Sequence, residues 1–74
     1  MFLDDKARNY IYILRLETGT IPFDILDDAK NAGAKYILRG RKAQIDQFIP
    51  GQTGIVPIVS WRFDSEVNTW VSST

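Results

Sequence analysis

The chain contains no cysteine and no histidine among its 74 residues. Thiolate and imidazole are the usual ligands of zinc and transition metals, so only an all-oxygen site for a hard cation would remain open. The same absences exclude the common nucleophilic triads and imidazole acid–base catalysis. We therefore expect no metal, no cofactor, no disulfide and no enzyme of these kinds.

Net charge and long apolar runs are also missing. Nine basic and nine acidic residues cancel, and the sequence pI is about 6.1. No whole-molecule field would steer the chain to nucleic acid or to anionic lipid. Its apolar runs are far too short to span a bilayer, and the first residues lack the basic-then-apolar plan of a secretion signal. We expect a cytoplasmic protein without membrane contact.

The length predicts a single domain over residues 1–74. A domain of this size buries about 60–65% of the surface that its unfolded chain exposes, so its stability margin is thin. Domains of this size are commonly stabilised by disulfides, by a metal or by oligomerisation. Since composition excludes disulfides and leaves only an all-oxygen site for a metal, self-association is the natural third option.

Residues 9–17 are predicted to form the central strand of a small sheet. β-branched and aromatic residues dominate the segment, which favours a strand over a helix. Side chains alternate across a strand, so Tyr12, Leu14 and Leu16 share one face while Ile11 and Ile13 share the other. Both faces therefore begin with apolar residues.

Five further elements follow in this interpretation. A helix is predicted over residues 21–32, with Thr20 as N-cap, Pro22 in the first turn and Gly33 as the stop signal. Residues 34–39 form a second strand, 41–49 a second helix, 55–64 a third strand and 69–72 a last short strand. The predicted fold is a small two-layer α+β sandwich of order β-α-β-α-β-β. Its mixed four-stranded sheet contains a parallel crossover and carries both helices on one face.

Residues 63–70, Phe-Asp-Ser-Glu-Val-Asn-Thr-Trp, are similar to the strand-turn-strand hairpin in blades of kelch-repeat propellers. The resemblance covers eight residues of a chain too short for a propeller, so it implies a hairpin and nothing more of the family. Asn68 is expected to adopt the left-handed conformation in the turn.

The main functional hypothesis rests on the apolar surplus of the predicted sheet. If the helices cover the face of Tyr12, Leu14 and Leu16, the opposite face stays apolar where a solvated face would be polar. Either this face binds another protein, or the N-terminal arm with Phe2 and Leu3 folds over it. Trp61 and Trp70 have two interpretations as well, as core residues or as interface residues. The expected interface residues are Ile11, Ile13, Val56, Ile58, Trp61 and Trp70.

The partner would be a second copy of the chain, as a homodimer, or a larger protein. Chains of this size class include viral accessory proteins of the phage type that inhibit a host enzyme, and subunits of larger particles. The alternative is a weak nucleic-acid or phosphate-binding domain that uses Arg39, Arg41 and Lys42, because loops that enter helices after parallel strands attract anions. The carboxylates of the predicted first helix lie on its polar side and are interpreted as solvated surface, and we expect no catalytic residues.

Overall fold

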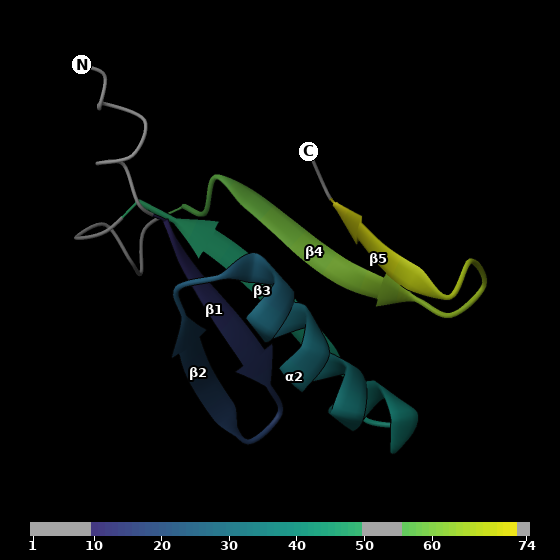
Figure 1. Cartoon of the computed structure of the whole chain (residues 1–74). Coiled ribbons are helices and arrows are strands. Elements are labelled where there is room, and N and C mark those ends of the chain that lie inside the picture. The colour runs from purple at the N-terminus through teal and green to yellow at the C-terminus, as the bar shows by residue number, and fades with distance from the viewer. Residues whose placement is uncertain (1–9, 50–55, 73–74) are drawn as a thin grey trace.

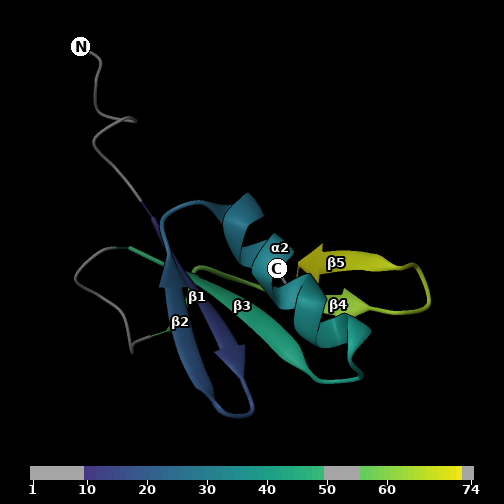
Figure 2. The ribbon, with the colours of Figure 1, turned by 60° about the horizontal axis from the view of Figure 1, so that its bottom comes forward.

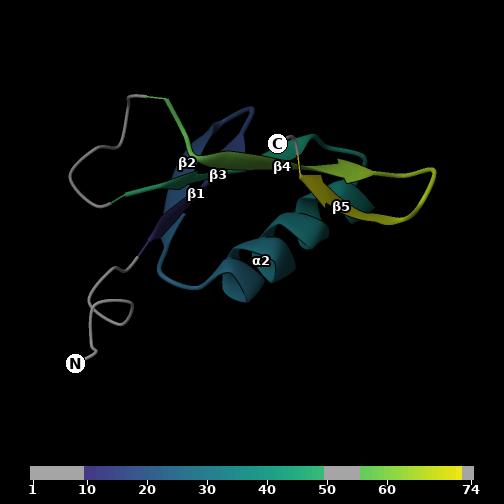
Figure 3. The ribbon, with the colours of Figure 1, turned by 90° about the horizontal axis from the view of Figure 1, so that it is seen from above.

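The computed structural model describes residues 10–49 and 56–72, which form one five-stranded sheet and one helix. The elements in chain order are β1 (Ile11–Leu16), β2 (Gly19–Phe23), α2 (Leu26–Leu38), β3 (Ala43–Phe48), β4 (Val59–Asp64) and β5 (Thr69–Ser72). The strands lie in the order β2-β1-β3-β4-β5, and each neighbouring pair is antiparallel. α2 crosses one face of this sheet (Figure 1, Figure 3).

The predicted mixed sheet of four strands with two helices is therefore wrong. β2 and β3, the strands that α2 connects, are both antiparallel to β1 and so run in the same direction, but β1 lies between them. The crossover expected between strands at 9–17 and 34–39 is therefore absent from the described residues, because residues 34–38 are helical, and α2 connects β2 to β3 instead. β3 is the middle strand, and β1, predicted as the central strand, occupies the adjacent interior place.

The predicted first helix began too early because its start signals belong to an edge strand. Thr20, Ile21 and Phe23 are residue types that favour strands, and they lie in β2. Pro22 faces Ile13 in the register of β1 and β2. A residue without an N–H is tolerated at a sheet edge, where one side of the strand needs no ladder partner.

α2 continues through Gly33, which was predicted to end it, and includes the segment predicted as the second strand. Gly33 is buried in the interior of the fold. A β-carbon at this position would lie 2.9 Å from Trp70 Cη2 and 3.1 Å from Leu14 Cδ1, so the packing requires glycine. The helix ends at Leu38 instead, and Gly40 follows two residues later with a left-handed φ of +78°. Gly40 N–H donates to the Ile37 carbonyl at 2.9 Å, and Arg41 N–H donates to the Tyr36 carbonyl at 2.9 Å. This pair of bonds is a Schellman motif.

Residues 43–48 form β3, although residues 41–49 were predicted to be helical. Ala43 and Ile45 pack toward α2, while Gln44 and Asp46 point to the opposite face. The segment therefore alternates with the period of a strand, and three apolar residues in nine had suggested a helix. The segment pairs with β1 on one side and with β4 on the other, and this pairing favours the strand over the helix.

The core lies between α2 and the sheet. Leu14, Ala29 and Ile45 are fully buried at its centre. Trp61 and Trp70 pack against this cluster from β4 and β5. The Trp61 ring lies 6.2 Å from that of Tyr12, and the Trp70 ring contacts that of Phe63 edge-on at 5.7 Å. The aromatic residues of the C-terminal half thus extend the core beyond the strands that the helix covers.

The C-terminal hairpin agrees with the prediction. β4 and β5 pair from Asp64 opposite Thr69 to Trp61 opposite Ser72, and they lie at the far end of the sheet from β2 (Figure 2). Asn68 has a φ of +57°, and the Asp64 carboxylate accepts the Glu66 N–H at 2.9 Å. The left-handed Asn68 is therefore confirmed. β4 begins at Val59, later than expected, and Ile55 lies outside the described residues.

Candidate functional site

One face of the sheet carries no helix within the described ranges, and we call it the helix-free face. Residues that pair across neighbouring strands point to the same side of the sheet. On each strand, every second residue therefore points toward α2, and the residues between them point away from it. These residues are Thr20, Pro22, Ile11, Ile13, Arg15, Gln44, Asp46, Phe48, Ser60, Arg62 and Val71.

The helix-free face is apolar at one end. Ile11 lies opposite Phe48, and Ile13 lies opposite Pro22 on one side and Asp46 on the other. Ile11 and Ile13 are half-buried, and Phe48 is buried. At the far edge of the same face, Val71 is 42% exposed. Ile11 and Ile13 at one end and Val71 at the other therefore leave apolar area open on this face, whereas Phe48 is already covered.

A buried carboxylate occupies the centre of this face. Asp46 is only 2% exposed. Its oxygens accept hydrogen bonds from Arg15 Nη1 at 3.0 Å, from Gln44 Nε2 at 2.8 Å and from Ser60 Oγ at 2.7 Å. The donors come from β1, β3 and β4, so the carboxylate ties three adjacent strands together. Every buried side-chain polar atom in the described ranges has a partner.

The surroundings of Asp46 act on its pKa in opposite directions. Burial raises the pKa because it disfavours the charged form, and this is the largest single effect. The hydrogen bonds from Gln44, Ser60 and Arg15, together with the Arg15 charge, lower it and outweigh the burial. The resulting pKa of Asp46 lies below its ordinary value of 3.8, so the group is an anion at neutral pH.

Arginines lie beside the carboxylate in the next row of the sheet. The register places Arg15, Gln44, Arg62 and Val71 side by side across β1, β3, β4 and β5. Arg15 keeps 57% of its side chain exposed even though it is paired with Asp46. It therefore presents to solvent a guanidinium whose orientation is already fixed.

The six predicted interface residues do not form one surface. Ile11 and Ile13 lie on the helix-free face, whereas Trp61 and Trp70 pack on the helix side. Val56 and Ile58 precede β4 and are 82% and 46% exposed, and Ile58 N–H donates to the Gln47 carbonyl at 2.8 Å. The N-terminal arm with Phe2 and Leu3 lies outside the described residues.

The sequence prediction missed the group around Asp46. The signal was present as the period-two alternation of Ala43 and Ile45 with Gln44 and Asp46. The segment was interpreted with a helical period, and no role was assigned to Asp46. The alternation of β1 also places Arg15 on the face of Ile11 and Ile13, but its partner could not be found without the register.

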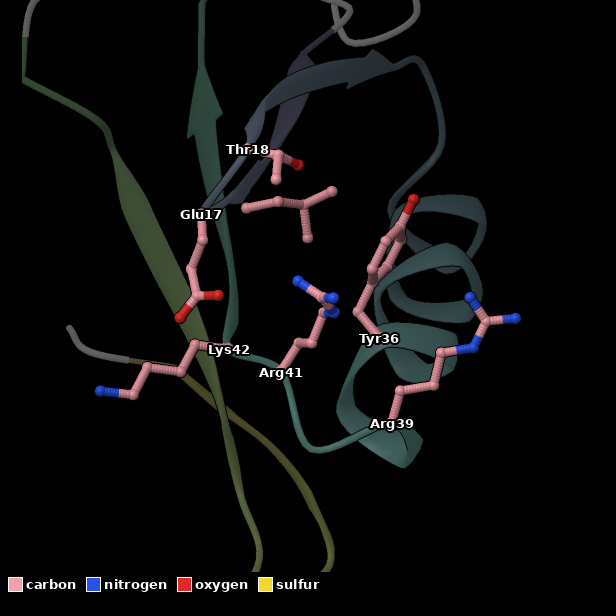
Figure 4. A pocket seen from close by; sticks show the side chains of 7 residues that line it. Glu17, Thr18, Tyr36, Arg39, Arg41 and Lys42 are labelled. Carbon is pink, nitrogen blue, oxygen red and sulfur yellow. The ribbon is translucent and has the colours of Figure 1, made fainter.

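The basic residues predicted to bind anions follow α2 and lead into β3. The premise of that prediction is wrong, because this loop enters a strand and not the N-terminus of a helix. Arg39, Arg41 and Lys42 nevertheless line one open pocket of about 270 Å³ at the C-terminal end of α2, together with Leu16, Glu17, Thr18 and Tyr36. Figure 4 shows the Arg41 side chain between Glu17 and Tyr36, while Arg39 and Lys42 point to opposite sides.

Comparisons of the chain with protein-family models, with curated proteins and with solved structures found no match. In the part of the chain that the structure describes, no three His, Cys, Asp or Glu side chains gather in a way that could hold a metal ion. Over the same residues, α2 is the helix present, and it is neither long nor apolar enough to cross a membrane.

Proposed function

We propose that this chain is a small, non-enzymatic protein-binding or assembly protein of the cytoplasm that acts through its helix-free face. The partner is a second copy of the chain or a larger protein. The observation that carries the proposal is the combination on one sheet face of half-buried Ile11 and Ile13 with an Arg15 side chain that Asp46 holds in place.

The apolar residues supply the driving force for association. A strand with a solvated face normally alternates toward polar residues, but Ile11 and Ile13 alternate with the core residues Tyr12 and Leu14. Covering apolar surface contributes roughly 25 cal/mol for each Å² removed from water. The two isoleucines therefore favour a partner over solvent.

Arg15 supplies specificity. Binding normally costs about 0.5–1.5 kcal/mol for each flexible side chain that becomes ordered. The hydrogen bond from Arg15 Nη1 to Asp46 orders Arg15 before a partner arrives, and among the described residues its other N–H groups have no acceptor. Arginine is also among the residues that contribute most at protein interfaces. We therefore expect the partner to present an oxygen acceptor, beside apolar side chains, to Arg15.

The small core supports the same proposal. Within residues 10–49 and 56–72, Leu14 and Ile45 are the large side chains that are fully buried, and one helix covers a sheet of five strands. Domains of this size commonly gain stability by association. A partner on the helix-free face would add the burial that α2 alone does not provide.

Fluorescence-detected sedimentation of the labelled chain, alone and in cell extract, tests the proposal. The wild-type chain is expected to sediment as a dimer or as a larger complex. Ile13→Lys and Val71→Lys place a charge on the helix-free face and are expected to shift the chain to a monomer. Leu38→Lys is the matched control, because Leu38 is 86% exposed on α2. Monomeric wild-type chain in both media would contradict the proposal.

A further inference from the structure

The geometry points to a second site, independent of the helix-free face: the pocket at the end of α2 binds a phosphate monoester through Arg41. The same chemistry is offered by a small phosphorylated molecule and by the terminal phosphate of a nucleic acid. The proposal rests on the fixed position of Arg41, on the charge of the pocket lining and on the chemistry of its walls.

The backbone fixes Arg41 at the pocket. Gly40 turns the chain with its left-handed φ, and the Schellman bond from Arg41 N–H to the Tyr36 carbonyl brings these two residues together. The same motif engages the Tyr36 and Ile37 carbonyls in hydrogen bonds, so the basic side chains of the lining have only the remaining negative potential of this helix end to outweigh. Arg41 therefore extends beside Tyr36 from a backbone that is already ordered (Figure 4).

The lining carries a charge that matches a phosphate monoester. Arg39, Arg41 and Lys42 contribute three positive charges and Glu17 one negative charge, so the net charge of the lining is +2. Among the described residues the sole ion pair is that of Arg15 with Asp46, so these three cations have no acidic partner there. A phosphate monoester carries a charge of about −1.5 to −2 at neutral pH, whereas a diester carries only one negative charge.

The walls add neutral donors and apolar surface. Thr18 and Tyr36 bring hydroxyl groups to the lining, and Leu16 contributes aliphatic surface. An arginine fork binds phosphate through two parallel N–H···O bonds, which are shorter and stronger than bonds between neutral groups. Arg41 would hold two phosphate oxygens, while Arg39 and Lys42 at the rim attract the anion from outside.

Amide chemical shifts of the isotope-labelled chain, titrated with inorganic phosphate and with glycerol phosphate, test this site. We expect saturable shifts at Thr18, Gly40 and Arg41, and roughly tenfold weaker binding in Arg41→Gln, since a charged hydrogen bond is lost. Lys35→Gln removes the same charge from an exposed position in the last turn of α2 outside the pocket, and it should bind as the wild type does. Arg41→Lys should restore part of the affinity.

Oligonucleotides with and without a 5′-phosphate distinguish the two sources of the ligand. Preference for the phosphorylated form assigns the site to nucleic-acid ends, and binding of glycerol phosphate without either oligonucleotide assigns it to small molecules. Equal binding of both oligonucleotides would overturn the proposal, because a diester would then suffice. Shifts that never saturate, or equal weakening by Arg41→Gln and Lys35→Gln, would also overturn it. The amide spectrum of each variant reports directly whether it is folded.

Discussion

Arg15 and Asp46 form a diagonal ion pair across two neighbouring strands, with Arg15 Nη1 3.0 Å from Asp46 Oδ2. In the register, Arg15 lies opposite Gln44 and Asp46 lies opposite Ile13. The pair therefore crosses from one row of the sheet to the next, and it holds β1 to β3 through side chains as well as through the backbone. It also combines an exposed cation with a buried anion, which makes Asp46 the residue on which the order of the helix-free face depends.

Asp46→Asn is expected to destabilise the fold by about 1–3 kcal/mol, as is typical for losing hydrogen bonds to a charged group. Arg15 donates to one carboxylate oxygen, and Gln44 and Ser60 donate to the other. The amide keeps one acceptor oxygen, so its NH₂ group must face either Arg15 or the pair Gln44 and Ser60, where it cannot accept their hydrogen bonds. Urea denaturation at neutral pH measures the loss. Glu17→Gln, an exposed carboxylate in the turn after β1, is the control and should change stability little. Equal stability of Asp46→Asn and wild type would show that the polar group at the centre of the sheet contributes nothing.

The stability that Asp46 contributes to the fold should decrease as the pH falls. Its pKa is lowered in the folded state, so the folded state binds its proton less readily than the unfolded state does. The stability that it contributes is complete above the ordinary value of 3.8 and is lost as the pH falls through the lower folded pKa. Urea titrations at neutral and at strongly acidic pH should show the difference between wild type and Asp46→Asn shrinking in acid. A difference that grows in acid would mean that the pKa is raised.

Gly33→Ala should destabilise the chain although alanine is the better helix former. The new β-carbon would lie 2.9–3.0 Å from the Trp70 indole and 3.1 Å from Leu14. Overpacking of this kind costs about 1–3 kcal/mol, against a gain in helix propensity of about 1 kcal/mol. Thermal or urea unfolding gives the net effect. Asn31→Ala lies on the exposed side of α2, so it changes helix propensity without overpacking the core, and it should be neutral or stabilising.

A second substitution tests whether the indole is the cause. Trp70→Phe removes the six-membered ring atoms that the new methyl group would meet. In that background Gly33→Ala should cost less than it does in the wild type. An unchanged cost would place the strain elsewhere, against Leu14 or the helix backbone.

Gly40→Ala should destabilise the end of α2 through the backbone alone. No atom lies within 4 Å of the position of its β-carbon, but its φ of +78° is unfavourable for residues with a side chain. The expected cost is about 1–2 kcal/mol. Gly40→Asn should cost less, because asparagine tolerates the left-handed region. Unfolding free energies of the two variants, measured side by side, give the order. A cost of alanine equal to that of asparagine would contradict this explanation.

The elements that the sequence predicted correctly are those with local signals. β1 is rich in β-branched and aromatic residues, and the β4–β5 hairpin has turn chemistry at Asp64 and Asn68. Neither depends on knowing what lies across the sheet. The membrane prediction agrees with the structure only in that α2 could not span a bilayer.

The elements that it missed are those whose signals depend on tertiary contacts. Gly33 looks like a helix stop, and only the approach of Trp70 explains a glycine inside α2. Pro22 looks like the first turn of a helix, but it also suits an edge strand. Ile45 and Phe48 suggested a helical face, whereas they point to opposite sides of β3. In each case a local preference compatible with two structures was decided by a distant residue.

Site-specific photo-crosslinking tests the role of the helix-free face most directly. A photoreactive residue at Thr20, an exposed position of that face, is compared in cell extract with one at Asn31 on the outer side of α2. We predict an adduct at position 20, either with a second copy or with a larger protein, which disappears when Ile13→Lys is added. Adducts of equal yield at both positions, or none at position 20, would contradict the assignment of this face to binding.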